Sequence, residues 1–199
     1  MAVRQSLLAI LDRGPCYGYQ LRAEFERRTG GTWALNVGQI YNTLDRLERD
    51  GFAAKGDQDE HGHVYWEITD AGRAEVRRWL RSPVQRPAAA RDELAVKLAV
   101  AATLPGVDAR GLVAAEREAS AARLEALTRS AADPEASSAQ GMARALVLDA
   151  LVCAAEAELR WLDRTADRLA QHPADSLALE LSDERPKRGR PVRAAATAA

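Results

Sequence analysis

Residues 36–69 read NVGQIYNTLDRLERDGFAAKGDQDEHGHVYWEIT, and the spacing of the apolar residues changes within this stretch. In the first half they recur every three or four positions, which predicts an amphipathic helix over residues 36–50 that Gly51 terminates. In the second half, residues 52–56 and the β-forming run VYWEIT at 64–69 flank the polar turn DQDEHGH. That half predicts a two-stranded β-hairpin.

Helical patterns lie on both sides of this stretch. Residues 6–11 and 17–28 form two short amphipathic patterns that a Gly-Pro pair separates. After the hairpin, a Thr-Asp pair caps a helix predicted at residues 71–82. The side of this helix that is expected to face inward carries Val76, Trp79 and Leu80. Three helices, a hairpin and a further helix follow the order of a winged helix-turn-helix.

The rest of the chain is helical up to its C-terminal tail. The proline-containing stretch SPVQRPAAA indicates a linker, which we place at residues 83–91 after a winged-helix domain at 1–82. Residues 92–172 predict an all-helical domain, and the apolar period fades over 173–199, which predicts a disordered tail. Within the helical domain, helices are expected at about 92–104, 108–130 and 139–170. The expected fold class is therefore mainly α (α+β).

Composition limits the classes of function. Apolar residues make up 47% of the 199 residues and the formal net charge is −1, so any attraction to nucleic acid must be local. Residues 1–85 contain twelve basic and twelve acidic residues. The two cysteines, Cys16 and Cys153, show no metal-ligand spacing, and the chain carries none of the common nucleotide-binding, hydrolase or zinc-protease motifs. We therefore expect no enzymatic activity, no cofactor and no metal.

No segment predicts a membrane partner or export. The apolar stretch near the N-terminus is broken by Asp12 and Arg13, so it is too short to span a bilayer, and it lacks a small-residue cleavage site. Two isolated thiols suit a reducing compartment. We expect a cytoplasmic protein.

The helix predicted at 36–50 has two distinct faces. Its apolar face carries Val37, Ile40, Leu44 and Leu47. Its opposite face carries Gln39, Asn42, Thr43, Arg46 and Arg49, with Tyr41 at the boundary. Amide and guanidinium groups can read base edges in the major groove, and a tyrosine hydroxyl can reach a phosphate. The alternative is an ordinary solvated helix face.

Four segments in this order resemble the PadR family of transcriptional regulators. They are GPCYGYQL at 14–21, GQIYNTLDRLERDG at 38–51, VYWEITDAG at 64–72 and RDELAVKLAVAA at 91–102. The resemblance implies a repressor that dimerises through its C-terminal helices, binds a pseudo-palindromic operator and often responds to a small aromatic or drug-like effector. The DNA contacts that it implies are Gln39, Tyr41, Asn42 and Arg46 on the helix, and Lys55 and His63 on the hairpin wing.

The wing departs from the family pattern. Family wings usually carry basic residues near the tip, whereas this wing carries Asp57, Asp59 and Glu60. Because acidic groups repel phosphates, we expect the wing to add little affinity for DNA. Two alternatives stay open: a winged-helix regulator without a small-molecule effector, and a protein-interaction adaptor.

The last long helix predicts a self-association seam. Its leucines recur at spacings close to those of a coiled coil, and the helix would be about 45 Å long. We expect a second copy of the chain to cover these residues, with two recognition helices about 34 Å apart on DNA. The alternative is a pairing with the helix at 108–130 of the same chain. The seam residues are Leu148, Leu151, Leu159, Leu162 and Leu169.

Two further predictions concern ligands. Trp79 and Trp161 are candidate contacts for a flat effector, although tryptophans at helical spacing more often belong to the core. In the tail, Arg188, Gly189, Arg190 and Pro191 resemble an AT-hook that could enter an A·T-rich minor groove. The alternative for these four residues is a solubilising disordered terminus.

Overall fold

The N-terminal part of the chain has the predicted winged-helix order. The computed structural model describes residues 2–84, 92–131, 138–173 and 176–180. The first helix begins earlier than the sequence pattern indicated, at Ala2, and the other elements lie close to their predicted positions. The elements are α1 (Ala2–Leu11), α2 (Gly18–Arg28), α3 (Val37–Arg49), β1 (Ala53–Gln58), β2 (Val64–Ile68) and α4 (Asp70–Arg81).

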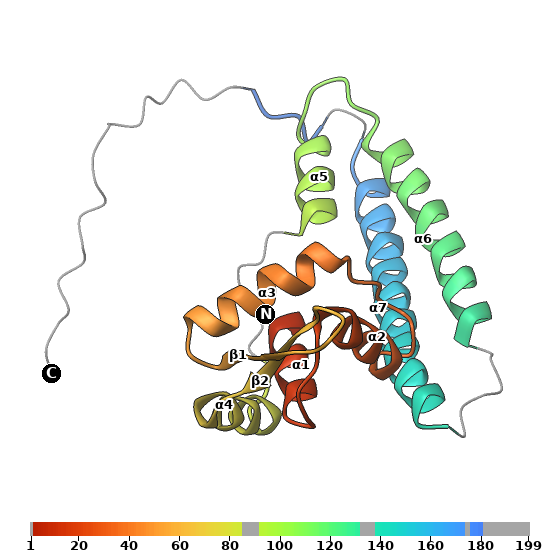
Figure 1. The fold of residues 1–199 in the computed structure, drawn as a ribbon. Coiled ribbons are helices and arrows are strands. Elements are labelled where there is room, and N and C mark those ends of the chain that lie inside the picture. Colours follow the sequence, from red (N-terminus) through yellow and green to blue (C-terminus); the bar gives the residue numbers. More distant parts are fainter. Residues whose placement is uncertain (1, 85–91, 132–137, 174–175, 181–199) are drawn as a thin grey trace, which may run out of the picture.

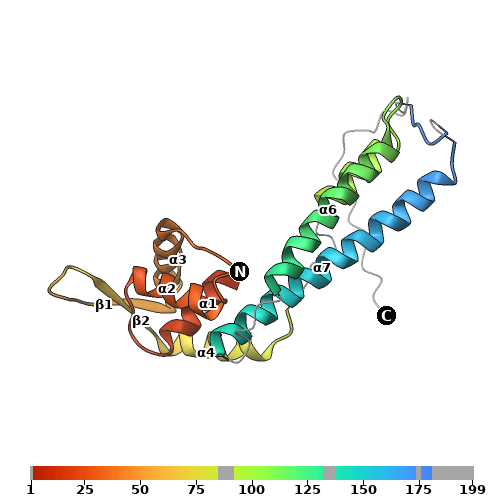
Figure 2. The same ribbon diagram turned by 90° about the vertical axis from the view of Figure 1, so that its right-hand side faces the viewer.

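Three helices make up the C-terminal part: α5 (Glu93–Ala101), α6 (Ala109–Ala131) and α7 (Ala139–Ala170). Helices α6 and α7 lie side by side and project away from the winged helix, while α7 begins beside α2 (Figures 1 and 2). Helix α5 lies beside the end of this pair that is remote from α2 (Figure 1). The mainly α fold class predicted from the sequence is confirmed.

One hydrophobic core holds the winged helix together. Trp66 of β2 is buried in it, and so is Cys16, whose backbone pairs with that of Trp66 and ties the start of α2 to the sheet. The amide of Cys16 donates to Trp66 O (3.1 Å) and the amide of Trp66 donates to Cys16 O (2.9 Å). Helices α1, α2 and α3 supply most of the other buried side chains, including Leu7, Leu8, Leu11, Leu21, Phe25, Ile40, Leu44 and Leu47.

The expectation for α4 is wrong in one position. Val76 is buried and Trp79 is half-buried, but Leu80 is 68% exposed. Leu80 follows Val76 by one turn and lies in the last turn of the helix, beyond the side chains that contact the core. A helical period identifies the side of a helix that is apolar, but it does not show where the core ends.

Helices α6 and α7 bury part of the predicted self-association seam within one chain. Leu162 is fully buried in a cluster with Leu98 and Val113, and Leu148 is also buried. A hydrogen bond also links α6 to α7, in which the Ser120 hydroxyl donates to Glu158 Oε1 (2.6 Å). The expectation that a second copy covers Leu148 and Leu162 is therefore corrected, because both are buried within a single chain, and α5 and α6 supply the neighbours of Leu162. The other predicted seam residues, Leu151, Leu159 and Leu169, are half-buried.

Several predictions lie outside the described residues. They concern most of the linker (85–91) and the AT-hook-like residues Arg188, Gly189, Arg190 and Pro191. None of the helices in the described part of the chain is both long enough and apolar enough to cross a membrane.

Candidate DNA-binding surface

A reciprocal capping box fixes the start of α3. The Gln39 amide N–H donates to Asn36 Oδ1 (2.8 Å), and the Asn36 amide N–H donates to Gln39 Oε1 (3.1 Å). Such a pair satisfies two helix-end donors that would otherwise lack partners. The side-chain oxygen of Gln39 is thus committed to the cap, and its side-chain NH₂ group is the part that faces outward.

The two faces of α3 are as predicted. Ile40, Leu44 and Leu47 are completely buried. On the outer face, Thr43 is half-buried, and its hydroxyl donates to Gln39 O (2.6 Å) within the helix. The exposed residues of this face are Gln39, Tyr41, Asn42, Arg46 and Arg49, and Arg49 Nε lies 3.7 Å from Asp50 Oδ1.

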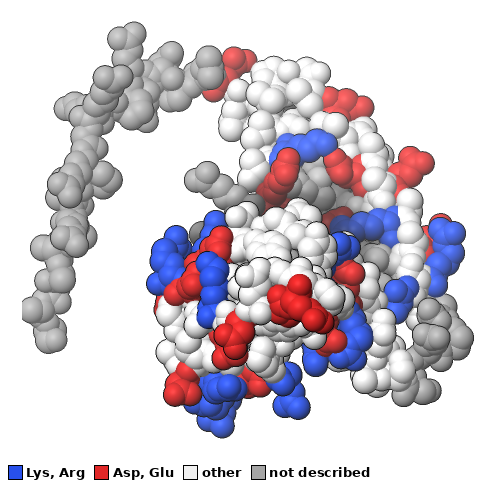
Figure 3. Space-filling model, viewed as in Figure 1, with Lys and Arg blue, Asp and Glu red and all other residues white. Residues whose placement is uncertain are grey.

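Arg46 is a cation of this surface that no carboxylate of the described residues neutralises. Two acidic residues near it are already paired: Glu48 Oε2 lies 3.0 Å from Lys55 Nζ, and Asp50 Oδ2 lies 2.7 Å from an Arg4 guanidinium nitrogen. Arg46 has no carboxylate partner among the described residues. Basic and acidic side chains lie beside one another on the N-terminal unit (Figure 3), so an arginine on this face that no carboxylate neutralises matters here.

The ring of Tyr41 packs closely against Gly18, the first residue of α2. A Cβ atom at Gly18 would lie 2.7 Å from Tyr41 Cζ and 2.9 Å from its hydroxyl oxygen, so only glycine accommodates the ring in this position. The residue before Gly18, Tyr17, makes no side-chain capping bond to α2. The Tyr41 hydroxyl therefore lies near a helix N-terminus whose amide groups point outward, an arrangement that suits phosphate.

The two predicted wing contacts are engaged within the chain. Lys55 Nζ is bound to Glu48 and lies 5.0 Å from the centroid of the Trp66 ring. His63 Nδ1 lies 2.9 Å from Asp59 Oδ2, and the His63 ring stacks on Tyr17 at 4.5 Å. Both residues therefore position the wing relative to α2 and α3.

Asp59 organises the wing tip. Its Oδ1 accepts hydrogen bonds from the amide groups of His61 and His63, each at 2.9 Å. Burial raises the pKa of Asp59, but the hydrogen bonds from His63 and His61 outweigh it and lower the pKa below its ordinary value. One of the three acidic wing residues is thus needed for the turn, whereas Asp57 and Glu60 are exposed.

Trp79 and Trp161 line separate cavities, and the charged residues that line the two cavities have opposite signs. Trp79 borders a cavity of about 210 Å³ together with Phe25, Arg13 and Arg28. Trp161 borders one of about 330 Å³ whose other charged lining residues are Asp92 and Glu158. The first therefore favours an anionic ligand and the second disfavours one.

The described residues contain no group of three or more His, Cys, Asp or Glu side chains that could hold a metal ion. Cys16 is buried, and that burial raises the pKa of its thiol, as expected for an unreactive core residue. Two further aromatic residues are exposed here, Tyr19 at the start of α2 and Trp33 in the loop after it. No periodicity marks such residues, because each is a single side chain at a helix start or in a loop.

Comparison with known proteins assigns the fold to a family. Residues 7–78 match the transcriptional regulator PadR-like family, and residues 90–170 match the virulence activator alpha C-terminal family. The Mycobacterium tuberculosis protein "Probable transcriptional regulator Rv1176c" is 31% identical over 189 residues, which cover 86% of this chain and 99% of that protein. This chain belongs to the PadR-like family of transcriptional regulators.

Solved structures share the fold of this PadR-like regulator. Bacillus subtilis PadR in complex with operator DNA is 23% identical, with a TM-score of 0.61, and the match covers 85% of this chain and 99% of that one. The same protein in complex with p-coumaric acid, at 22% identity, also gives a TM-score of 0.61, over the same 85% and 99% of the two chains. The Vibrio cholerae virulence activator AphA is 22% identical, with a TM-score of 0.61 over 85% of this chain and 98% of that one. The winged-helix prediction is confirmed, and this chain is a DNA-binding transcriptional regulator of the PadR-like family.

Proposed function

We propose that this PadR-like regulator represses transcription as a homodimer on a pseudo-palindromic operator. The observation that carries the proposal is the outer face of α3, where the unpaired Arg46 lies on the same exposed surface as Asn42 and Gln39. Because Ile40, Leu44 and Leu47 on the opposite face of α3 are fully buried, the helix can present only its outer face, which carries these groups, to a major groove.

Each residue of this surface has a proposed role. Arg46 and Asn42 read base edges, and the side-chain NH₂ of Gln39 donates to a base or a phosphate. Tyr41 contacts a phosphate through its hydroxyl. Thr43 supports the surface by packing, since its hydroxyl is bonded to the helix backbone. Lys55 and His63 hold the wing and contribute to DNA binding only indirectly.

The proposed division of labour assigns DNA binding to residues 1–82, a linker to 83–91 and dimerisation to 92–172. Support for the dimer comes from apolar side chains that stay exposed in a single chain, beside the half-buried Leu151 and Leu159. Large apolar side chains that a single chain leaves exposed are candidates for an interface with a second copy. The exposed residues are Met142 and Leu146 on α7, Val96 and Val100 on α5, and Leu104 after it.

The proposals that this regulator represses transcription and that an effector releases it are based on similar proteins. The curated name of the Bacillus subtilis relative, which is 27% identical over 100 residues (48% of this chain and 54% of that protein), is "Negative transcriptional regulator PadR". A structure of that protein holds p-coumaric acid. We propose that a small aromatic ligand releases this regulator from DNA, with the cavities at Trp79 and Trp161 as candidate sites. A PadR-like regulator without an effector, or a protein-interaction adaptor, is the alternative.

We propose that the C-terminal tail binds DNA without affecting which operator sequence is recognised. Residues 185–193 contain five basic residues and no acidic ones, so the segment around Arg188, Gly189, Arg190 and Pro191 would add sequence-independent affinity. Deleting residues 173–199 should then reduce the salt dependence of binding and leave the operator unchanged.

Selection of genomic fragments that bind the purified full chain tests the proposed function. The expected result is enrichment of a small set of promoters that share an inverted repeat. Recovery of no duplex above background, at low as well as moderate salt, would contradict it and favour the adaptor. Titrating aromatic compounds into the recovered complex then separates the regulator with an effector from the one without.

A further inference from the structure

The wing carries two of the three histidines of the chain, His61 and His63. It projects from the winged helix on the side away from α6 and α7 (Figure 2). Strands β1 and β2 with the turn between them, residues 53–68, contain four acidic residues and one lysine. The wing therefore has a net charge of −3 while both histidines are neutral and of −1 when both are protonated. Histidine changes its charge between about pH 5 and 8, so the charge of the wing depends on pH in that range.

One carboxylate fixes the proton of the neutral His63 ring, since Asp59 Oδ2 lies 2.9 Å from His63 Nδ1. Although burial raises the pKa of Asp59, its hydrogen bonds from His63 and His61 bring it below the ordinary value, so the carboxylate stays ionised near neutral pH. An ionised carboxylate only accepts hydrogen bonds, so the proton of neutral His63 is on Nδ1. Nothing in the described part of the chain binds Nε2, and the His63 side chain is 42% exposed. A second proton can therefore be gained at Nε2.

The fold of the wing accommodates both charge states of His63. Its ring stacks on that of Tyr17 with 4.5 Å between the centroids, and Tyr65 packs edge-on against Tyr17 at 5.6 Å. A cation is attracted by an aromatic face and by a carboxylate. Protonation of His63 therefore adds a positive charge without breaking its contacts with Tyr17 and Asp59.

Only the two histidines of the described wing change charge near neutral pH. Burial, and then the nearby Asp59 carboxylate, raise the pKa of Tyr65, so its hydroxyl stays neutral. The ring of His61 lies 6.1 Å from that of His63 in an edge-on arrangement. His61 is 71% exposed and lies 3.7 Å from Glu60, so solvent screens its charge more than that of His63.

Tyr17 places the His63 ring beside the surface that is proposed to bind DNA. The residue after Tyr17 is Gly18, and a Cβ atom there would lie 2.7 Å from Tyr41 Cζ. The contact of His63 with Tyr17 and the contact of Gly18 with Tyr41 are thus one residue apart at the start of α2. Because unpaired charges act over about 10 Å at 0.1 M salt, a phosphate at the Tyr41 hydroxyl is within the influence of this wing.

We infer that His63 links operator binding to proton uptake: protonation of its imidazole strengthens the binding of DNA, and deprotonation weakens it. While His63 is neutral, the exposed Asp57 and Glu60 repel the phosphates, and the charged imidazole offsets part of that repulsion. Since phosphates attract the charged form, DNA binding takes up protons, and by linkage the affinity rises as pH falls. His63 acts through the charge of the wing and does not read a base. The inference rests on the proposed placement of DNA against α3.

Operator affinity at two pH values tests the inference. In fluorescence anisotropy with the full chain at constant ionic strength, the wild type should bind the selected operator about three- to tenfold more tightly at about pH 6 than at about pH 8. His63→Gln keeps a polar side chain beside Asp59 but cannot be charged, so it should lose most of this difference. His63→Arg is charged at both pH values and should bind at the higher pH about as tightly as the wild type does at the lower one.

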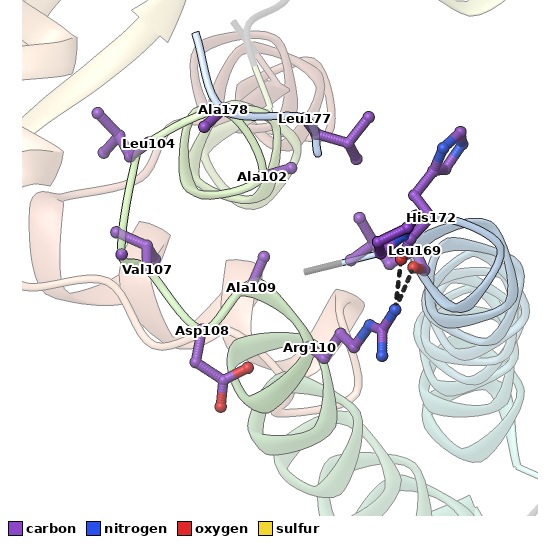
Figure 4. A pocket seen from close by; sticks show the side chains of 12 residues that line it. Ala102, Leu104, Val107, Asp108, Ala109, Arg110, Leu169, His172, Leu177 and Ala178 are labelled. Carbon is purple, nitrogen blue, oxygen red and sulfur yellow. Dashed lines mark hydrogen bonds between the residues drawn. The ribbon is translucent and has the colours of Figure 1, made fainter. Parts of the chain in front are cut away.

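The other two histidines are the matched controls. His172 lies at the remote end of α7, where its carbonyl oxygen accepts a hydrogen bond from Arg110 Nη2 (2.6 Å; Figure 4). His172→Gln should therefore keep the pH profile of the wild type. His61→Gln removes the more exposed wing histidine and should keep most of that profile. Thermal unfolding at each pH shows whether every variant is folded under the conditions of the titration.

Calorimetry in two buffers of different ionisation enthalpy counts the protons directly. At neutral pH, the wild type should take up a fraction of a proton as it binds the operator, and His63→Gln should take up clearly less. An operator affinity of the wild type that does not rise toward the lower pH would overturn the inference. Identical pH profiles for the wild type and His63→Gln would also overturn it.

The same titrations keep this inference distinct from the proposed function. A chain that binds its operator equally tightly at both pH values contradicts only the role of His63. A chain that binds no duplex at either pH contradicts the proposed function, and the proton linkage with it.

Discussion

The ring of Tyr41 on α3 lies directly over Gly18, the first residue of α2, so that a Cβ atom at position 18 would be 2.7 Å from Tyr41 Cζ. Tyr41 is 40% exposed, and its hydroxyl reaches the start of α2. Helix α2 can therefore approach the Tyr41 ring of α3 this closely only because residue 18 has no side chain. In the proposed complex with DNA, Gly18 acts by setting the position of Tyr41.

Gly18→Ala should weaken operator binding with little loss of stability. The added Cβ meets the far end of a side chain, which can swing away, so the free energy of unfolding should change by less than about 1 kcal/mol. The displaced hydroxyl loses its phosphate contact, which should cost about 1 kcal/mol of binding free energy, as should Tyr41→Phe. Anisotropy and thermal unfolding measure the two effects. Wild-type operator affinity in both variants would remove Tyr41 from the surface.

Gly30→Ala should destabilise the contact between α2 and α7. Gly30 has φ +64°, and its Cβ would lie 2.3 Å from Arg144 Cα, which is backbone that cannot swing away. Gly31 is the matched control, because its φ is +69° and a Cβ there would meet no atom within 4 Å. Gly31→Ala should therefore cost only the left-handed backbone penalty of about 1–2 kcal/mol, and Gly30→Ala about 1–3 kcal/mol more.

Urea unfolding of the two glycine variants measures that difference. If both variants lose the same free energy of unfolding, Arg144 of α7 does not pack against Gly30 of α2 in solution. A larger loss for Gly30→Ala isolates the packing of Arg144 from the conformational cost that both alanines share.

Leu146→Glu should convert the proposed dimer into monomers. Leu146 is 66% exposed on α7 in a single chain, so a charge there leaves the fold of the monomer intact and is costly only if a second copy covers it. Leu80→Glu, at a similar exposure on α4, is the control and should stay dimeric. Sedimentation velocity reports the mass of each. A dimeric Leu146→Glu variant would exclude this part of α7 from the interface.

Acid should weaken the attachment of α4 to α1 through Glu75. The hydrogen bond from Arg78 lowers the pKa of Glu75 below the ordinary value of 4.5, and the bond from Gln5 (2.7 Å) acts in the same direction. A lowered pKa in the folded state means that this stabilisation is complete above the unfolded value and is lost as pH falls below it. Glu75→Gln should therefore be less stable than wild type at pH 7 and closer to it near pH 4. Thermal unfolding at both pH values checks this, and an unchanged gap would contradict it.

The winged helix and the faces of α3 could be predicted because both depend on local periodicity. The change of period within residues 36–69 separates helix from hairpin, and Ile40, Leu44 and Leu47 face the core wherever the helix packs. Gly18 belongs to the family motif at 14–21, but the sequence does not show why a glycine is needed there. The need comes from a contact with Tyr41, which lies in a different helix further along the chain.

The remaining parts depend on contacts that no local pattern encodes. An apolar stripe on α7 shows that something covers it, but not that Leu148 and Leu162 are already buried within one chain, with α5 and α6 against Leu162. The family resemblance implied DNA contacts at Lys55 and His63, but it could not show that Glu48 and Asp59 bind these side chains within the fold. Pairings of this kind need the relative positions of several elements.

Operator affinity of the Arg46→Ala variant tests the central claim most directly. We predict a loss of about 1–3 kcal/mol in anisotropy titrations on the selected operator, no change for Arg129→Ala, and little change for either variant on a scrambled duplex. If Arg46→Ala binds the operator as tightly as the wild type does, the outer face of α3 does not read DNA in the way described.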